Sequence, residues 1–154
     1  MALNNNSGTC AATISSYQLA IELAEFGFQV FPLNKNQKTP KFPGWQKHAT
    51  SDLSTIKYWL GDGGNYGVPT GRVNNLVVID YDAYQAEQDN LAYLQSKHGL
   101  LPNTFTVKTR AGGIHKYFKY PSNYTIKNSA SSVAPNIDIR GDGGYVVGPG
   151  SYVG

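Results

Sequence analysis

The sequence predicts an α+β domain whose sheet is largely antiparallel or mixed. Helical and strand-like patterns alternate up to residue 98, and a run of short strand-like segments follows, whereas a doubly wound sheet would continue to alternate. The 154 residues suffice for one domain with a hydrophobic core. The 17 glycines and 8 prolines indicate many turns between short elements.

Each element is predicted from its own pattern. Helices are expected where a Ser or Thr cap precedes apolar residues at helical spacing, and where glycine ends the run. Strands are expected where apolar residues form short runs or alternate with polar ones. The predicted elements are a helix from Ser15 or Ser16 to Gly27, a strand over 28–33, a helix capped by Thr50 or Ser51 and ended by 61–65, a strand over 76–82, a helix over 83–98, and strands over 104–109, 114–120, 136–140 and 145–147.

The segments between these elements are predicted to be connections. Residues 1–13 are small and polar and are expected to form a disordered leader, so the folded domain is expected to span 14–154. A loop over 34–45 is rich in lysine and proline, and loops of special composition often carry binding groups. A glycine-bounded segment covers 66–71, and the Ser- and Asn-rich stretch 121–136 is expected to be mobile.

The overall composition excludes several classes of protein. A net charge of +3 permits contact with phosphates without requiring it. Cys10 is the single cysteine, which excludes an intrachain disulfide and a cysteine-rich zinc site. The sequence has no signal-peptide pattern and no apolar run of about 18 residues or more, so it predicts a soluble, cytoplasmic protein without a membrane partner.

The stretch Leu76–Asp82 joins a buried-strand pattern to two carboxylates. Because side chains alternate along a strand, Asp80 and Asp82 are expected on one face and Tyr81 on the other, in the packing. Two neighbouring carboxylates repel each other unless a cation lies between or beside them. The pattern therefore favours a divalent metal site, although Asp-x-Asp also occurs in glycosyltransferases, phosphatases and calcium loops.

A second polar group surrounds the diglycine turn that ends at Gly113. His115 and Lys116 follow this turn, and Arg110 precedes it. Glycine lets a backbone approach a ligand closely, and cationic donors suit phosphate oxygens. The pattern favours a phosphate or sugar contact at His115.

A third carboxylate lies in the predicted strand 136–140. Its two isoleucines are expected to face the core, with Asp138 and Arg140 on the opposite side. If this strand neighbours the Asp80 strand, three carboxylates converge. Three carboxylates can hold two divalent ions, which can activate an attacking oxygen and stabilise a leaving oxygen in phosphoryl transfer.

These motifs and several others occur in an order that resembles a known family. From about Ser16 to its last residue, the chain resembles the N-terminal catalytic domain of bifunctional DNA primase/polymerases (prim-pol), of the archaeo-eukaryotic primase superfamily. The segments that carry the resemblance are 27–33, 38–40, 44–45, 49–50, 65–71, 78–82, 101–104, 109–115 and 137–147.

The resemblance implies a fold and a set of site residues. The fold would be an RNA-recognition-motif-like (RRM-like) sheet with an N-terminal α/β unit packed beside it. Two Mg²⁺ or Mn²⁺ ions would be held by Asp80, Asp82 and Asp138. The incoming nucleotide would be bound by His115 and Gly113, with Arg110 and Arg140 as further triphosphate or template contacts.

The implied activity is nucleotidyl transfer from nucleoside triphosphates on a single-stranded DNA template, which Lys35, Lys38 and Lys41 would support. The family usually continues past this point, so the chain is expected to be a fragment whose parent carries a helicase or other replication module. The residues alone leave two alternatives open. One is a metal-dependent nuclease or phosphohydrolase that uses the histidine as general base, and the other is a non-catalytic nucleic-acid or nucleotide-binding module.

Overall fold

The computed structural model describes residues 14–82 and 88–154, which form an α+β fold with antiparallel sheets. The predicted leader 1–13 lies outside the described residues. None of the helices in the described part is long and apolar enough to cross a membrane. The elements are α1 (Ser16–Glu25), β1 (Phe31–Pro32), the 3₁₀ helix η1 (Trp45–Lys47), α2 (Leu53–Leu60), β2 (Tyr66–Pro69), β3 (Leu76–Tyr81), α3 (Asn90–His98), β4 (Thr106–Lys108), β5 (Ile114–Lys119), β6 (Ser129–Ala134), β7 (Ile137–Arg140) and β8 (Tyr145–Val147).

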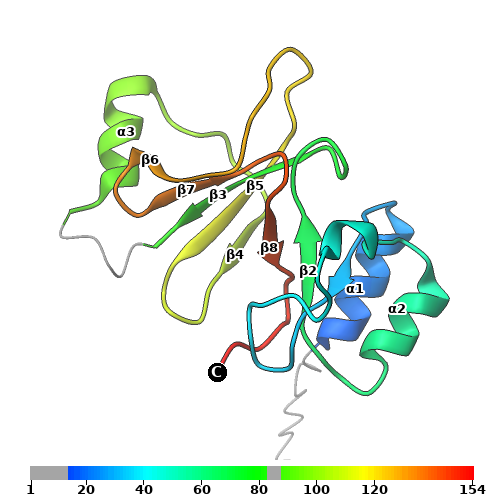
Figure 1. Cartoon of the computed structure of the whole chain (residues 1–154). Helices are drawn as coiled ribbons and strands as arrows, with labels where there is room; N and C mark the ends of the chain where they lie inside the picture. Colours follow the sequence, from blue (N-terminus) through cyan, green and yellow to red (C-terminus); the bar gives the residue numbers. More distant parts are fainter. Residues whose placement is uncertain (1–13, 83–87) are drawn as a thin grey trace, which may run out of the picture.

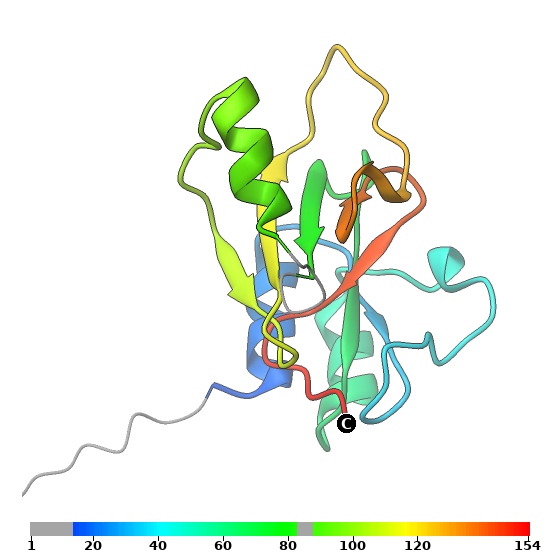
Figure 2. The ribbon, with the colours of Figure 1, turned by 90° about the vertical axis from the view of Figure 1, so that its left-hand side faces the viewer.

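The strands form two sheets. The larger has the order β4-β5-β3-β7-β6, and the smaller has the order β1-β2-β8. Every pairing between these strands is antiparallel. Figure 1 shows α3 beside the five-stranded sheet on one side of the molecule and α1 and α2 on the other, and Figure 2 gives the view turned by 90°.

Alternation along β3 divides the core into two parts. Ile79 and Tyr81 face a small cluster that includes Leu91 of α3. Leu76 and Val78 face a larger cluster built from α1, α2, β2 and β8. The five-stranded sheet is therefore packed on both faces, and Tyr81 is buried as its position in the pattern predicts.

The helix ends agree with the predictions in part. The Ser15 side chain caps α1, and Gly27 follows the helix with a positive φ of 88°. The predicted cap of α2 is wrong, because Asp52 accepts the Thr55 N–H at 2.7 Å and caps this helix. A carboxylate is as good a cap as a hydroxyl, and the apolar pattern did not separate the adjacent candidates.

The predicted helix over 83–98 is too long. Its first five residues lie outside the described residues, and the next two precede the helix. Helix α3 begins after Asp89, whose side chain accepts the Ala92 N–H at 2.9 Å. Gly99 ends it as predicted.

Three other segments differ from what the sequence patterns indicated. The strand predicted over 28–33 is reduced to Phe31–Pro32, and the segment predicted to be mobile over 121–136 contains β6. The segment 66–71 contains β2, which the sequence pattern does not indicate because Gly67 and Pro69 are unusual within a strand. Gly67 is required there because a Cβ atom would lie 2.3 Å from the Phe31 ring.

The turn between β7 and β8 is tied to the β2–β3 loop and to β5. Asp142 accepts the Arg72 backbone N–H at 2.9 Å and the Tyr120 hydroxyl at 2.8 Å, and it forms an ion pair with the Arg72 guanidinium. The Tyr120 hydroxyl in turn accepts the Ile126 N–H at 2.7 Å. These contacts give Asp142 a structural role, as the turn sequence suggests.

We predict that Asp142→Asn flattens the acid limb of the stability curve. The Arg72 N–H and then the Tyr120 hydroxyl hold the pKa of Asp142 below its ordinary value. A depressed pKa in the folded state stabilises the protein above the unfolded pKa of about 3.9, and this stabilisation is lost as pH falls through the folded value. Urea titrations between about pH 6 and pH 3 should show a smaller loss of unfolding free energy in the variant. An unchanged slope would contradict this role.

Candidate active site

The candidate site lies on β3 and its two neighbours, on the face away from α3. In the register of the sheet, Asp80 is the partner of His115 on β5 and of Asp138 on β7. The three side chains therefore form one row across three adjacent strands, because directly paired residues share a face. The condition set by the sequence pattern, that the Asp138 strand lies next to the Asp80 strand, is met.

Asp80 is the centre of this row. Its Oδ1 lies 3.3 Å from His115 Nε2, and its Oδ2 accepts hydrogen bonds from Arg140 Nη2 at 2.9 Å and Nε at 3.3 Å. Burial raises the pKa of the Asp80 carboxyl, but His115 and then Arg140 outweigh burial and bring this pKa below its ordinary value. The carboxylate is thus held ionised in a largely buried position.

Asp138 shares the same guanidinium and receives a backbone donor. Its Oδ2 accepts from Arg140 Nη2 at 2.7 Å, and its Oδ1 accepts from the Ser131 N–H at 2.8 Å. Ser131 has a φ of 47°, and the pairing of β6 with β7 shifts register between Ser129 and Ala134. Such a bulge changes the direction of backbone groups next to a site, and no sequence pattern indicates it because it depends on the pairing of β6.

Asp82 follows β3 and extends the carboxylate row. Burial and then the neighbouring carboxylates of Asp80 and Asp138 raise its pKa, whereas the Lys38 ammonium and His115 lower it. Lys38 lies in the loop between β1 and η1. Its backbone carbonyl accepts a hydrogen bond from the Tyr145 hydroxyl at 3.0 Å. The charge of this loop lysine therefore acts on the Asp82 carboxyl, which the sequence could indicate only through the lysine-rich composition of this loop.

Gly113 supports the same geometry from β5. A Cβ atom at this position would lie 2.7 Å from the Tyr81 carbonyl oxygen and 3.2 Å from Asp82 Oδ1. Glycine at this position therefore lets the β4–β5 turn come close to the end of β3. This approach places the β4–β5 turn against Asp82.

Two cationic residues of the same motif point elsewhere. Lys116 pairs with Ile79, which puts it on the opposite face of the sheet from His115. Arg110 is exposed, donates to the Val153 carbonyl at 2.6 Å and stacks on the Tyr152 ring. The structure therefore brings Arg140, rather than Arg110 or Lys116, into contact with the carboxylates.

A protein-family model matches most of the chain. The model of the bifunctional DNA primase/polymerase N-terminal family, Prim-Pol, matches residues 20–154. The chain belongs to this family. No curated protein sequence matches the chain. Membership indicates primase/polymerase-type nucleotidyl transfer, with DNA and nucleotides as substrates.

The donor set of this Prim-Pol chain suits a hard divalent cation. The carboxylates of Asp80, Asp82 and Asp138 supply oxygen ligands, which Mg²⁺ and Mn²⁺ prefer. The mutual repulsion that raises the pKa of Asp82 is the effect a bound cation would relieve. Within the described residues, however, no three acidic, His or Cys side chains already converge closely enough to hold an ion. Arg140 engages two of the carboxylates instead.

Proposed function

We propose that the row formed by Asp138, Asp80 and His115, extended by Asp82, is the active site for DNA-templated nucleotidyl transfer. The observation that carries this proposal is the direct pairing of Asp80 with both Asp138 and His115 across adjacent strands. Carboxylates and a histidine from three different strands converge on one side of the sheet, and family membership supplies the class of reaction. The five-stranded sheet would serve as the RRM-like catalytic sheet, with α3 on its far face.

The proposed ligands for two divalent ions are Asp80, Asp82 and Asp138. When bound there, such ions lower the pKa of an attacking hydroxyl and stabilise charge on the leaving phosphates. Asp80 and Asp138 hold their positions through His115, Arg140 and the Ser131 N–H. Each of these contacts preorganises an oxygen before substrate arrives.

Arg140 is proposed to change partners during binding. In the structure its guanidinium neutralises Asp80 and Asp138 together, which is the role a cation would take over. Once released from one carboxylate, the guanidinium can donate to the phosphate oxygens of a nucleotide, for which its planar fork is suited. We propose that His115 also contacts the nucleotide, as does Gly113 at the adjoining turn. Arg110 is proposed to contact the nucleotide farther from the carboxylates.

The lysine loop is proposed to contact the template. The charge of Lys38 acts on the Asp82 carboxyl, and Lys35 and Lys41 flank Lys38 in the same loop. Lysines at this position would attract a polyanionic single strand towards the carboxylate row.

The test is an assay for synthesis by the 154-residue chain. Single-stranded DNA, a labelled nucleoside triphosphate and Mn²⁺ should give new oligonucleotides or extended primers, and EDTA should abolish them. Both ribo- and deoxynucleotides belong in the assay. The absence of any product with folded protein would overturn the proposal, and loss of the DNA without added nucleotides would identify a nuclease instead.

A further inference from the structure

A second functional surface begins next to the candidate site, on the same face of the sheet. Along β5, His115 is followed on this face by Tyr117 and Lys119, because alternate residues share a face. Tyr117 and Lys119 lie roughly 7 and 13 Å from His115 along the strand. This line leads from the carboxylate row to the opposite end of the sheet, but Tyr117 in its middle packs against the larger core cluster, so the exposed route between the two ends passes along the edge strand β4.

Phe105 lies beside the middle of this line. The Tyr117 N–H donates to the Phe105 carbonyl at 3.0 Å, so the pairing of β4 with β5 extends to Phe105. The two rings meet edge to face, with centroids 5.3 Å apart. Tyr117 packs against the larger core cluster, whereas Phe105 remains 62% exposed to solvent. An apolar ring thus projects beside the site without covering the core.

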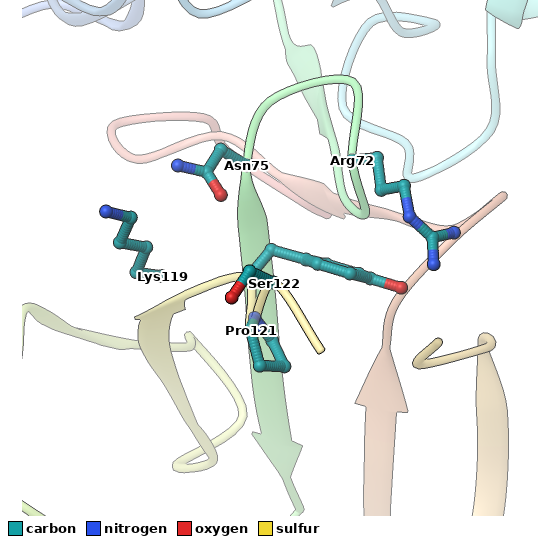
Figure 3. A pocket seen from close by; sticks show the side chains of 6 residues that line it. Arg72, Asn75, Lys119, Pro121 and Ser122 are labelled. Carbon is teal, nitrogen blue, oxygen red and sulfur yellow. The ribbon is translucent and has the colours of Figure 1, made fainter. Parts of the chain in front are cut away.

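Cationic side chains continue the surface at the far end of β5. An open pocket of about 570 Å³ is lined by Lys119, Arg72, Asn75, Tyr120, Pro121 and Ser122. Figure 3 shows Lys119 and Arg72 on opposite sides of this pocket, with Ser122 between them. Lys119 is exposed, and the Arg72 side chain is 57% exposed although it is paired with Asp142. Two cations and a hydroxyl around one hollow suit the oxygens of a phosphate.

We propose that Phe105, Lys119 and this pocket form a binding track for a single-stranded polynucleotide. A base stacks on the Phe105 ring, and backbone phosphates lie against Lys119 and Arg72. An exposed aromatic ring beside a cationic groove is the combination that binds single strands without sequence preference. The identification of the ligand as a polynucleotide rests on the proposed function, but the track lies outside the carboxylate row.

The ligand could present a base either from a polynucleotide or from a free nucleotide, and charge favours the polynucleotide. Of the two cations that line the pocket, Lys119 lies two residues along β5 from Tyr117, on the side away from His115, and Arg72 lies across the pocket from Lys119 (Figure 3). A mononucleotide whose phosphates lie at the carboxylate row leaves these cations without a ligand. A single-stranded polynucleotide that crosses Phe105 reaches both the carboxylate row and the cations of the pocket.

The experiment measures binding of a labelled oligo(dT) by fluorescence anisotropy, in EDTA and without nucleotides. We expect Phe105→Ala to weaken binding roughly 5- to 150-fold, which corresponds to about 1–3 kcal/mol for one stacked base. Lys119→Gln should weaken binding less and should lower the slope of log Kd against log salt by about 0.7 for one lost phosphate contact. The matched controls are Tyr58→Ala and Lys57→Gln, since both residues are exposed on α2.

Each outcome bears on the track. Effects no larger than those of the α2 controls would overturn it. An equal effect of Phe105→Ala on an abasic oligomer would also overturn it, because a stacked base would then be absent. A loss confined to mononucleotide binding would assign Phe105 to the incoming nucleotide and refute the track. Because synthesis is not measured here, failure of the track and failure of the proposed function are separate results.

Discussion

Asp80→Asn is expected to reduce nucleotidyl transfer by at least about 100-fold. Partners that merely support a metal ligand contribute roughly 10- to 100-fold, and Asp80 is proposed as a ligand itself. The substitution keeps the size of the side chain but removes the charge that faces His115 and Arg140. Steady-state rates of primer extension, measured in Mn²⁺ and in Mg²⁺, provide the comparison.

A thermal shift separates a lost metal site from a damaged fold. An ion present at 100 times its Kd stabilises the native state by about 2.7 kcal/mol, so Mn²⁺ should raise the Tm of the wild-type chain by several degrees. We expect Asp80→Asn to remove most of this shift. Asp62→Asn, in the exposed turn after α2, is the matched control and should retain both the shift and the activity. If Asp80→Asn retains both the thermal shift and the activity, the assignment of Asp80 as a metal ligand is refuted.

Gly141→Ala is expected to destabilise the fold by about 1–3 kcal/mol, because overpacking forces the backbone to move. A Cβ atom at Gly141 would lie 2.1 Å from the Ile126 carbonyl oxygen, which is backbone and cannot rotate away. The same oxygen accepts the Asp142 N–H at 2.7 Å, so displacement of Ile126 also disturbs the contacts of Asp142. The Tm should fall by roughly 2–4 °C for each kcal/mol lost.

The matched control for this substitution is Gly64→Ala. A Cβ atom at Gly64 would meet the Leu60 side chain at 3.4 Å, which is an ordinary contact with a side chain. Its effect on the unfolding free energy should therefore be small. If the two variants unfold at the same temperature, the close packing around Gly141 is not a source of stability.

The residues of the site could be predicted because their signals are local. An apolar run that ends in carboxylates placed Asp80 on a strand, and alternation placed Asp138 on another strand and Tyr81 in the core. The diglycine turn marked the hairpin that carries His115. Each inference needed only a few neighbouring residues, so sequence patterns sufficed.

Other features depend on segments that lie far apart in the chain. Strand β2 was hidden because Gly67 and Pro69 are poor strand formers, and its pairing with β8 returns the chain to the N-terminal sheet. Ser131 reaches Asp138 through a bulge whose position depends on the pairing of β6 with β7. The charge of Lys38, in the loop that follows β1 of the smaller sheet, lowers the pKa of Asp82. Local propensity carries no information about these encounters.

The sequence by itself determined the α+β class, the family and the identities of the acidic and histidine residues. The tertiary structure alone decided that Arg140 bridges two carboxylates, that Lys116 faces away from His115 and that Phe105 projects beside the site. The physical reason is that side-chain type and periodicity are properties of a short segment. Strand register is a property of the whole sheet, and a shift of one residue would exchange the two faces.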